Sequence, residues 1–195
     1  VSGSDGSGGT VSLDAAHRVI ATQPSSITAN GTVSGGVITV SGGYDANGGL
    51  FSSAGWTATA SIGVGGSVGV QGGGVDLYGA ALDVSGGIGG GRIAIGGGLT
   101  GDLVVAPSTR LIADATLAGD GGTISLLSQT STVAYGVYSA RGGALGGDGG
   151  QVEASSLGAV TMGASIDTGA PVGHAGTLLL DPRNLVIDDT LGQFP

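Results

Sequence analysis

The 195-residue sequence has no cysteine and no lysine, and it contains only five prolines, two phenylalanines and one tryptophan. Without cysteine, the chain forms neither disulfide bonds nor sites that depend on a thiolate. The missing lysine and the net charge of −9 argue against nucleic acid or an anionic membrane surface as a partner. No apolar run approaches the ~18–20 residues of a membrane-spanning helix, and the first residues show no signal-peptide pattern. We therefore expect one domain that is not membrane-embedded and that is a fragment of a longer protein.

Glycine accounts for 45 of the 195 residues, which raises the possibilities of disorder and of collagen. Disordered chains are poor in aliphatic residues, whereas this sequence is 40% hydrophobic and only 10% charged. The glycines also lack the every-third spacing of a collagen triple helix. Helix-favouring residues are scarce, and no long stretch has apolar residues at helical spacing. The composition predicts a folded all-β domain in which glycine occupies positions where no other residue fits.

Seven short runs of alternating residues recur along the chain, each directly after a glycine. The runs are TVSL, VITV, SVGV, RIAI, TISL, QVEA and TLLL, and they follow Gly9, Gly36, Gly66, Gly91, Gly122, Gly150 and Gly176. These glycines lie 25 to 31 residues apart, and the second and fourth residues of every run are apolar. Such a pattern has period two and one buried face. Most copies of the repeat contain two further strand-like runs. We therefore expect three short strands in each copy.

A parallel β-solenoid explains this pattern, because each coil buries its apolar column on the same column of the coil below. We expect about seven three-sided coils in a single segment over residues 1–195. Corners of successive coils stack ~4.8 Å apart, and glycine supplies positive φ there and has no side chain to clash. The segment GGALGGDGG, residues 142–150, is expected to form the wide corner between the third and first faces.

The second repeat departs from the pattern between residues 43 and 62. It contains Tyr44, Phe51 and the single tryptophan, Trp56. We expect this segment to leave the solenoid as a loop excursion whose exposed rings bind a ligand, since tyrosine and tryptophan stack on sugars or anchor partners. Packing of the same rings in a small satellite core under the loop is the alternative, and the sequence favours packing over binding.

The segment SARGGALGGDGGQVEASSLGAVTMGASIDTGAPVGHAGTLLLDPRNLVI, residues 139–187, resembles the filamentous-haemagglutinin-type exoproteins of two-partner secretion systems. A looser similarity extends back through ADATLAGDGGTISL, ALDVSGGIGGGRIAIGG and GGTVSLDAAHRVIAT. The resemblance implies a right-handed parallel β-helix that an outer-membrane secretion pore exports to the bacterial cell surface. It also implies adhesion or biofilm formation, with glycans, cell surfaces or neighbouring rods as partners. The family's Asn-Pro-Asn-Gly motif is missing here, so the segment resembles the passenger rod and not the export domain.

Candidate catalytic and metal-binding residues are few. Asp5, Asp120 and Asp148 lie in glycine-rich corners, but their offsets differ from the calcium-binding nonapeptide, and we interpret them as turn residues that cap amides. Asp188 and Asp189 are adjacent and would point to opposite faces of a strand. His17 and His174 are too far apart in the sequence to suggest a metal site. We therefore predict no catalytic residue, no metal and no cofactor.

The sequence thus favours a structural and adhesive rod segment of a secreted surface exoprotein, and not an enzyme. Two alternatives stay open. A polysaccharide-active β-helix enzyme would need acids clustered on one face. An ice-binding solenoid would need rows of threonine on adjacent coils, whereas the pair Thr57 and Thr59 has no neighbouring copy.

Overall fold

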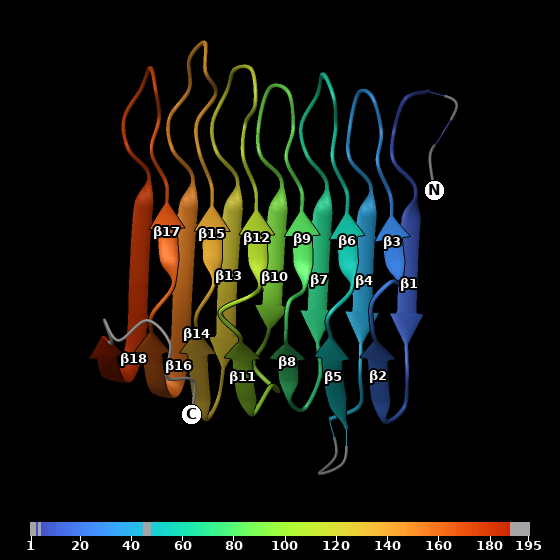
Figure 1. Ribbon diagram of the computed structural model, residues 1–195, viewed down its shortest axis with the longest axis vertical. Helices are drawn as coiled ribbons and strands as arrows, with labels where there is room; N and C mark the ends of the chain where they lie inside the picture. Colours follow the sequence, from blue (N-terminus) through green and yellow to red (C-terminus); the bar gives the residue numbers. More distant parts are fainter. Residues whose placement is uncertain (1–2, 4, 45–47, 188–195) are drawn as a thin grey trace.

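The computed structural model of the chain describes residues 3, 5–44 and 48–187. These residues form a right-handed parallel β-helix of 18 strands (Figure 1). Each strand pairs in parallel with the strand one coil before or after it, as β4 does with β1 and β7. The all-β fold class is confirmed, and no helix long and apolar enough to cross a membrane occurs among the described residues.

Three faces make up each coil. The first face contains β1 (Thr10–Asp14), β4 (Val37–Ser41), β7 (Ser67–Gln71), β10 (Arg92–Gly96), β13 (Thr123–Ser128) and the first halves of β16 (Gln151–Met162) and β18 (Thr177–Ile187). The second face contains β2 (Arg18–Ala21), β5 (Gly49–Ser52), β8 (Val75–Leu77), β11 (Asp102–Val105), β14 (Ser131–Ala134) and the second halves of β16 and β18. The third face contains β3 (Ser26–Thr28), β6 (Gly55–Thr57), β9 (Ala81–Asp83), β12 (Arg110–Ile112), β15 (Val137–Ser139) and β17 (Ser165–Asp167).

The number of coils is close to the prediction of about seven. The third face is a six-stranded sheet, so six coils are complete, and β18 supplies the first two faces of the next one. Strands β16 and β18 run through the corner between the first two faces, with a register shift between Ser156 and Ala159. These continuous strands join the first and second faces into one 12-stranded sheet.

The core consists of apolar columns that run along the axis of the solenoid. On the first face, the second and fourth residues of each run point inward, as Ile93 and Ile95 do on β10, and both are almost completely buried. The pattern weakens at the two ends, where Leu13 is 42% and Leu178 is 46% exposed. These residues lie on β1 and β18, the outermost strands of the first face, so only one neighbouring coil covers them.

Glycine at the corner before the first-face strands from β4 to β18 is required because the backbones of successive coils approach closely. A Cβ atom on Gly122 would lie 2.0 Å from the carbonyl oxygen of Gly91, and one on Gly150 would lie 2.0 Å from that of Gly122. None of these three glycines has a positive φ. The lack of room for a Cβ atom therefore requires glycine at these positions. Positive φ occurs at other glycines, such as Gly147, with φ of 114°.

The expected loop excursion over residues 43–62 is wrong for residues 48–62. Strand β5 pairs in register with β2 and β8, and β6 pairs with β3 and β9, so the second coil has the same three faces as its neighbours. The coil accommodates its aromatic residues because the strand register directs Phe51 outward and Trp56 into the core. Residues 45–47 lie outside the described residues.

Replacing Gly122 by alanine is expected to destabilise the fold strongly, because the new methyl group would collide with backbone of the preceding coil that is itself hydrogen-bonded. We expect a loss of roughly 1–3 kcal/mol or more in the free energy of unfolding, measured by denaturant titration. Gly98→Ala is the matched control, since a Cβ at Gly98 meets nothing within 4 Å. Equal stability of the two variants would contradict the close approach of the corners.

Candidate functional site

The outward side chains of the second face form the most distinctive surface of the solenoid. Ile20, Phe51, Asp76 and Val104 occupy the same register position on β2, β5, β8 and β11. The residues before them, such as Leu50 on β5, are the ones that point into the core. Alternation along each strand therefore directs this column toward solvent.

A shallow groove lies beside this column, where two adjacent coils have glycine at the same register position. Register places Arg18 next to Gly49, and the neighbouring pairs place Gly49 next to Gly74 and Gly74 next to Asp102. The surface is open at Gly74, where an added Cβ would meet only the Asp102 carbonyl oxygen, 3.9 Å away. The groove has a volume of about 310 Å³ and is lined by Arg18, Ile20, Gly48, Gly49, Leu50, Phe51, Gly74 and Asp76.

An aromatic pair borders the groove. The rings of Phe51 and Tyr78 stack with centroids 5.7 Å apart and an interplanar angle of 24°. Tyr78 lies two residues after Asp76, so it is the diagonal neighbour of Phe51 on the adjacent coil. Phe51 is half-buried and Tyr78 is 39% exposed. The pair therefore offers an apolar surface that a flat ligand such as a sugar ring can contact.

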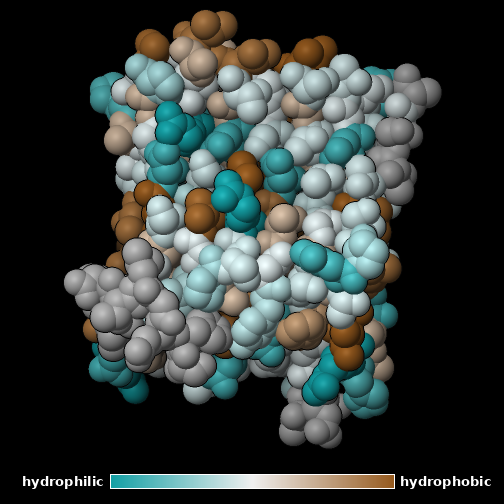
Figure 2. All heavy atoms as spheres, in the orientation of Figure 1, coloured by the Kyte–Doolittle hydropathy of each residue, from teal (hydrophilic) through white to brown (hydrophobic). Residues whose placement is uncertain are grey.

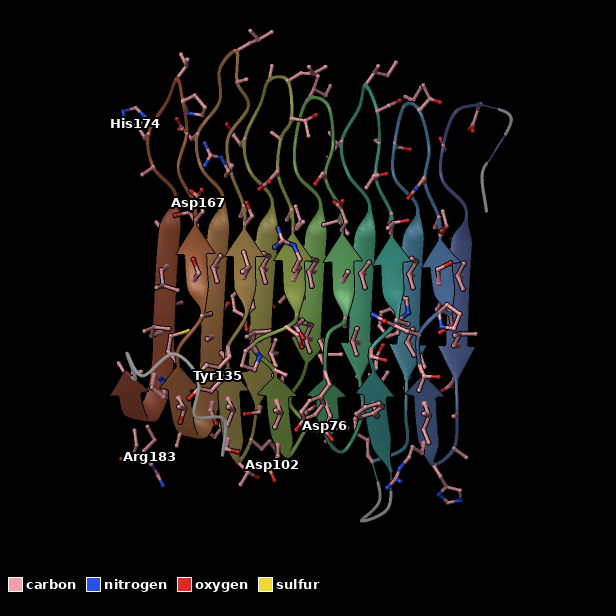
Figure 3. The ribbon with its side chains drawn as sticks, in the orientation of Figure 1. Asp76, Asp102, Tyr135, Asp167, His174 and Arg183 are labelled. Atoms are coloured by element: carbon pink, nitrogen blue, oxygen red, sulfur yellow. The ribbon has the colours of Figure 1, made fainter. Side chains whose placement is uncertain are left out.

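Two carboxylates and one guanidinium set the electrostatics of the groove. Partial burial raises the pKa of Asp76, the nearby negative charge of Asp102 raises it further, and Arg18 opposes the shift. Asp102 accepts a hydrogen bond of 2.7 Å from the Ser131 hydroxyl on the next coil. Asp76 and Asp102 lie on neighbouring strands of the same face (Figure 3). The groove thus combines an apolar ring surface with groups that both donate and accept hydrogen bonds.

The residues predicted to bind a ligand are not brought together. Phe51 lines the groove, whereas Tyr44 lies before β5 outside its lining, 43% exposed, with its hydroxyl donating to Gln71 Oε1 over 2.9 Å. Arg18, Asp76 and Tyr78 were not identified from the sequence. What they share is a position on or directly after a second-face strand, and this can be recognised only once the strands are aligned.

Trp56 is a core residue, and the expectation that its ring is exposed is wrong. Its side chain is fully buried on β6, in the third-face column between Ile27 and Leu82. The same coil contains small buried residues, Ala54 and Ala58, that leave room for the indole. Among the described residues, no hydrogen-bond partner reaches the buried Nε1 atom. The alternative of packing therefore holds for this ring, although in the main core and not in a satellite core.

The corner aspartates cap backbone amides, as interpreted from the sequence. Asp5 accepts from the Ser7 amide over 2.9 Å within its own turn. Asp120 and Asp148 act between coils instead. Asp120 accepts from the Asp148 amide and Asp148 accepts from the His174 amide, both over 2.8 Å. The His174 amide is also the main cause that lowers the pKa of Asp148.

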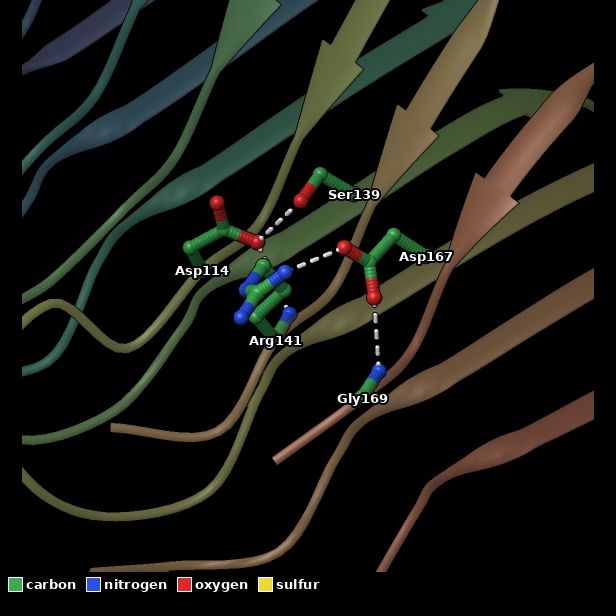
Figure 4. Close-up of polar contacts among 5 residues, drawn as sticks. All are labelled: Asp114, Ser139, Arg141, Asp167 and Gly169. Atoms are coloured by element: carbon green, nitrogen blue, oxygen red, sulfur yellow. Dashed lines mark hydrogen bonds and ion pairs between the residues drawn. The ribbon is translucent and has the colours of Figure 1, made fainter. Parts of the chain in front are cut away.

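A second polar ladder joins the ends of the third-face strands. Asp114 accepts hydrogen bonds from the Ser139 hydroxyl and from the Arg141 amide of the next coil. The Arg141 guanidinium forms an ion pair with Asp167, one coil further on (Figure 4). The Gly169 amide, followed by Arg141, lowers the pKa of Asp167. These contacts tie three successive coils together at one edge.

Metal-binding side chains do not gather in the part of the chain that the structure describes, where no group of three or more His, Asp or Glu could hold an ion. Asp188 and Asp189 lie outside the described residues. Thr10, Thr123 and Thr177 share one register column, but Val37, Ser67, Arg92 and Gln151 separate them. No uninterrupted threonine row forms at this column.

No family model, no curated protein and no solved structure matches the chain. The structure itself defines the class: a parallel β-solenoid that carries a shallow, partly aromatic groove on its second face.

Substitution of Trp56 is expected to lower stability and not merely surface binding. Trp56→Ala should cost about 3–5 kcal/mol because it leaves a large cavity in the core. Trp56→Leu should cost clearly less, since leucine occupies the same column at Leu82 and Leu111. Thermal unfolding followed by circular dichroism measures both. An unchanged melting temperature for Trp56→Ala would contradict burial of the ring.

Acid is expected to destabilise the solenoid through Asp148 and Asp167, whose pKa values lie below the usual value of 3.8 in the folded state. Both carboxylates therefore stabilise the fold above that value, and this contribution is lost as the pH falls through their lower folded-state pKa values. Melting temperatures measured from about pH 6 to about pH 2 should fall steeply at the acid end. Asp148→Asn should flatten this fall, and its difference from the wild type should disappear at the lowest pH. A constant difference across the series would exclude the carboxylate of Asp148 as a cause.

Proposed function

We propose that this chain is an adhesive rod segment of a secreted bacterial surface protein, and that it contacts glycans through the second-face groove. The solenoid is a structural rod, built from coils that repeat along one axis. The segment that resembles filamentous-haemagglutinin-type exoproteins corresponds to the last coils, from β15 to β18. Export through an outer-membrane pore and a location on the cell surface belong to the same proposal.

The observation that supports glycan contact is the stacked pair of Phe51 and Tyr78 beside the groove. Sugar rings have apolar C–H faces that pack on aromatic rings, and their hydroxyls bond to carboxylates and guanidinium groups. Arg18 and Asp76 supply those polar groups in the groove lining, and Asp102 lies on the strand next to Asp76. An open groove of this kind suits a chain that passes across it, such as a surface polysaccharide, better than a small molecule that must be enclosed.

The groove also favours a second candidate function, a polysaccharide-active enzyme. The pKa of Asp76 is raised and a second carboxylate, Asp102, lies on the next coil. A carboxyl group with a raised pKa next to an ionised one is the pair that glycoside hydrolysis uses. We favour adhesion because the groove is shallow and open to solvent, whereas glycosidic cleavage requires a substrate held in a fixed pose.

Loss of the aromatic pair is expected to weaken glycan binding without unfolding the chain. Phe51→Ala and Tyr78→Ala should each weaken binding to a glycan recognised on an array by about tenfold, the effect of roughly 1.4 kcal/mol. Tyr44→Ala is the matched control, because this exposed tyrosine lies outside the groove lining. Circular dichroism should show the same β-rich spectrum for all three variants.

Two outcomes would contradict the adhesive proposal. Equal binding by the wild type and the groove variants would remove the groove as the contact surface. Turnover of a glycan by the wild type that is lost in Asp76→Asn would establish the enzymatic function in its place.

A further inference from the structure

Each loop that joins the third face to the next first face carries one aliphatic side chain that is at least half exposed. These residues form the aliphatic ridge: Val33, Ile62, Ile88, Leu117, Leu145 and Val172. Their exposed fractions lie between 50% and 79%, and Leu145 is the most exposed. Figure 2 shows hydrophobic residues along the corresponding upper edge of the molecule. Each ridge residue precedes its repeat glycine by three to five positions.

Backbone hydrogen bonds join the loops that carry the ridge residues from Val33 to Leu145. The amide of Leu145 donates to the carbonyl of Leu117 over 2.7 Å, and the amide of Ile62 donates to the carbonyl of Thr32 over 3.0 Å. Ile88 and Leu117 bond in the same way to residues 63 and 87 of their preceding coils. The tips are therefore spaced like the strands, ~4.8 Å apart. Glycines such as Gly63, Gly87 and Gly146 flank the tips and leave the aliphatic groups uncovered.

A contiguous row of this kind differs from the scattered apolar residues of an ordinary surface. Single exposed leucines are normal, but contiguous apolar surface of several hundred Å² marks interaction sites. Six half-exposed aliphatic side chains in one line reach roughly that size, taking about 100 Å² for each fully exposed side chain.

We propose that the aliphatic ridge is a lateral docking surface for a second copy of this chain, ridge against ridge. A row of side chains at ~4.8 Å intervals is matched by a partner with the same interval, and an identical solenoid has it. Two such rows interdigitate as the faces of a steric zipper do. The proposal concerns self-association and does not rest on glycan binding by the second-face groove.

Charge next to the ridge favours an antiparallel arrangement. At the corner position beside the ridge, the last coils have Asp120, Asp148 and His174, whereas the earlier coils have the uncharged residues Ser34, Val64 and Gly89. Parallel pairing would place the aspartates against each other. Antiparallel pairing places them opposite the uncharged coils, and it makes a closed two-fold dimer. Val33 then faces Val172, Ile62 faces Leu145, and Ile88 faces Leu117.

The expected affinity is low. Stable dimers bury ~800 Å² on each partner, which is more than the ridge alone provides. The two copies also repel each other, because each carries a net charge of −9. Added salt screens this repulsion. Self-association should therefore be reversible, concentration-dependent and stronger at high ionic strength.

Sedimentation equilibrium of the 195-residue chain tests the proposal. We expect a monomer–dimer equilibrium that strengthens with sodium chloride. Leu145→Ser should raise the dimer dissociation constant by about tenfold or more, because the two-fold axis removes the contact twice. Leu99→Ser is the matched control, since Leu99 is 67% exposed in the loop between β10 and β11, away from the ridge. Ile88→Ser serves as the ridge variant should Leu145→Ser fail to give the wild-type circular dichroism spectrum.

Disulfide trapping tests the orientation, which is straightforward because the chain has no cysteine. Ser61→Cys places a thiol beside Ile62, and Ala144→Cys places a thiol beside Leu145. Oxidation of the mixed proteins should give mainly the disulfide between the two different variants, whereas parallel pairing would give each variant linked to itself.

Three results would overturn the proposal. A chain that stays monomeric at its solubility limit in high salt has no such interface. An equal effect of Leu99→Ser and Leu145→Ser would place the contact elsewhere. Binding to phosphatidylcholine vesicles that depends on Leu145, without self-association, would identify a lipid surface as the occupant.

Discussion

Parallel hydrogen bonding between successive coils is the constraint on which the other features of this protein depend. It fixes the spacing of equivalent residues at ~4.8 Å, so whatever stands at one position lies directly against its counterpart. At the first-face corner, this brings the Gly91 carbonyl oxygen within 2.0 Å of where a Cβ of Gly122 would be. Inside the coil, the same spacing makes apolar columns that exclude water. On the surface, it turns a residue type repeated in several coils into a continuous row.

The arrangement of the coils was predictable from the sequence because its signals are local and recur. Alternation in a run such as RIAI specifies which side chains face inward, and Ile93 and Ile95 are buried as predicted. The glycine before each run identifies the corner. The prediction for the second repeat is wrong because it treats Trp56 and Phe51 as one group of rings. Period two separates them: Phe51 is an outward residue of β5 and Trp56 an inward residue of β6.

The candidate site was less predictable because it depends on register between strands. Arg18 and Asp102 are distant in the sequence, and Gly49 and Gly74 are ordinary in a chain with 45 glycines. Only the alignment of β2, β5, β8 and β11 shows that two glycines fall side by side and open a groove. The pKa of Asp76 is raised by its partial burial and, further, by Asp102 on the neighbouring coil, and neither is visible in the sequence. Phe51 was identified because aromatic residues are rare here, a property of composition that needs no alignment.

The direction of the strands has a mechanical consequence. Strands lie across the axis along which the coils stack, so the hydrogen bonds between β10 and β13, or between β13 and β16, run along that axis. Tension applied along that axis pulls directly on the bonds of a terminal coil, and those bonds open one after another. Each coil that detaches releases a repeat of extended chain while the coils behind it keep their own pairing. Under a steady pull, the molecule therefore lengthens in steps and keeps a folded remainder, as an extensible tether does.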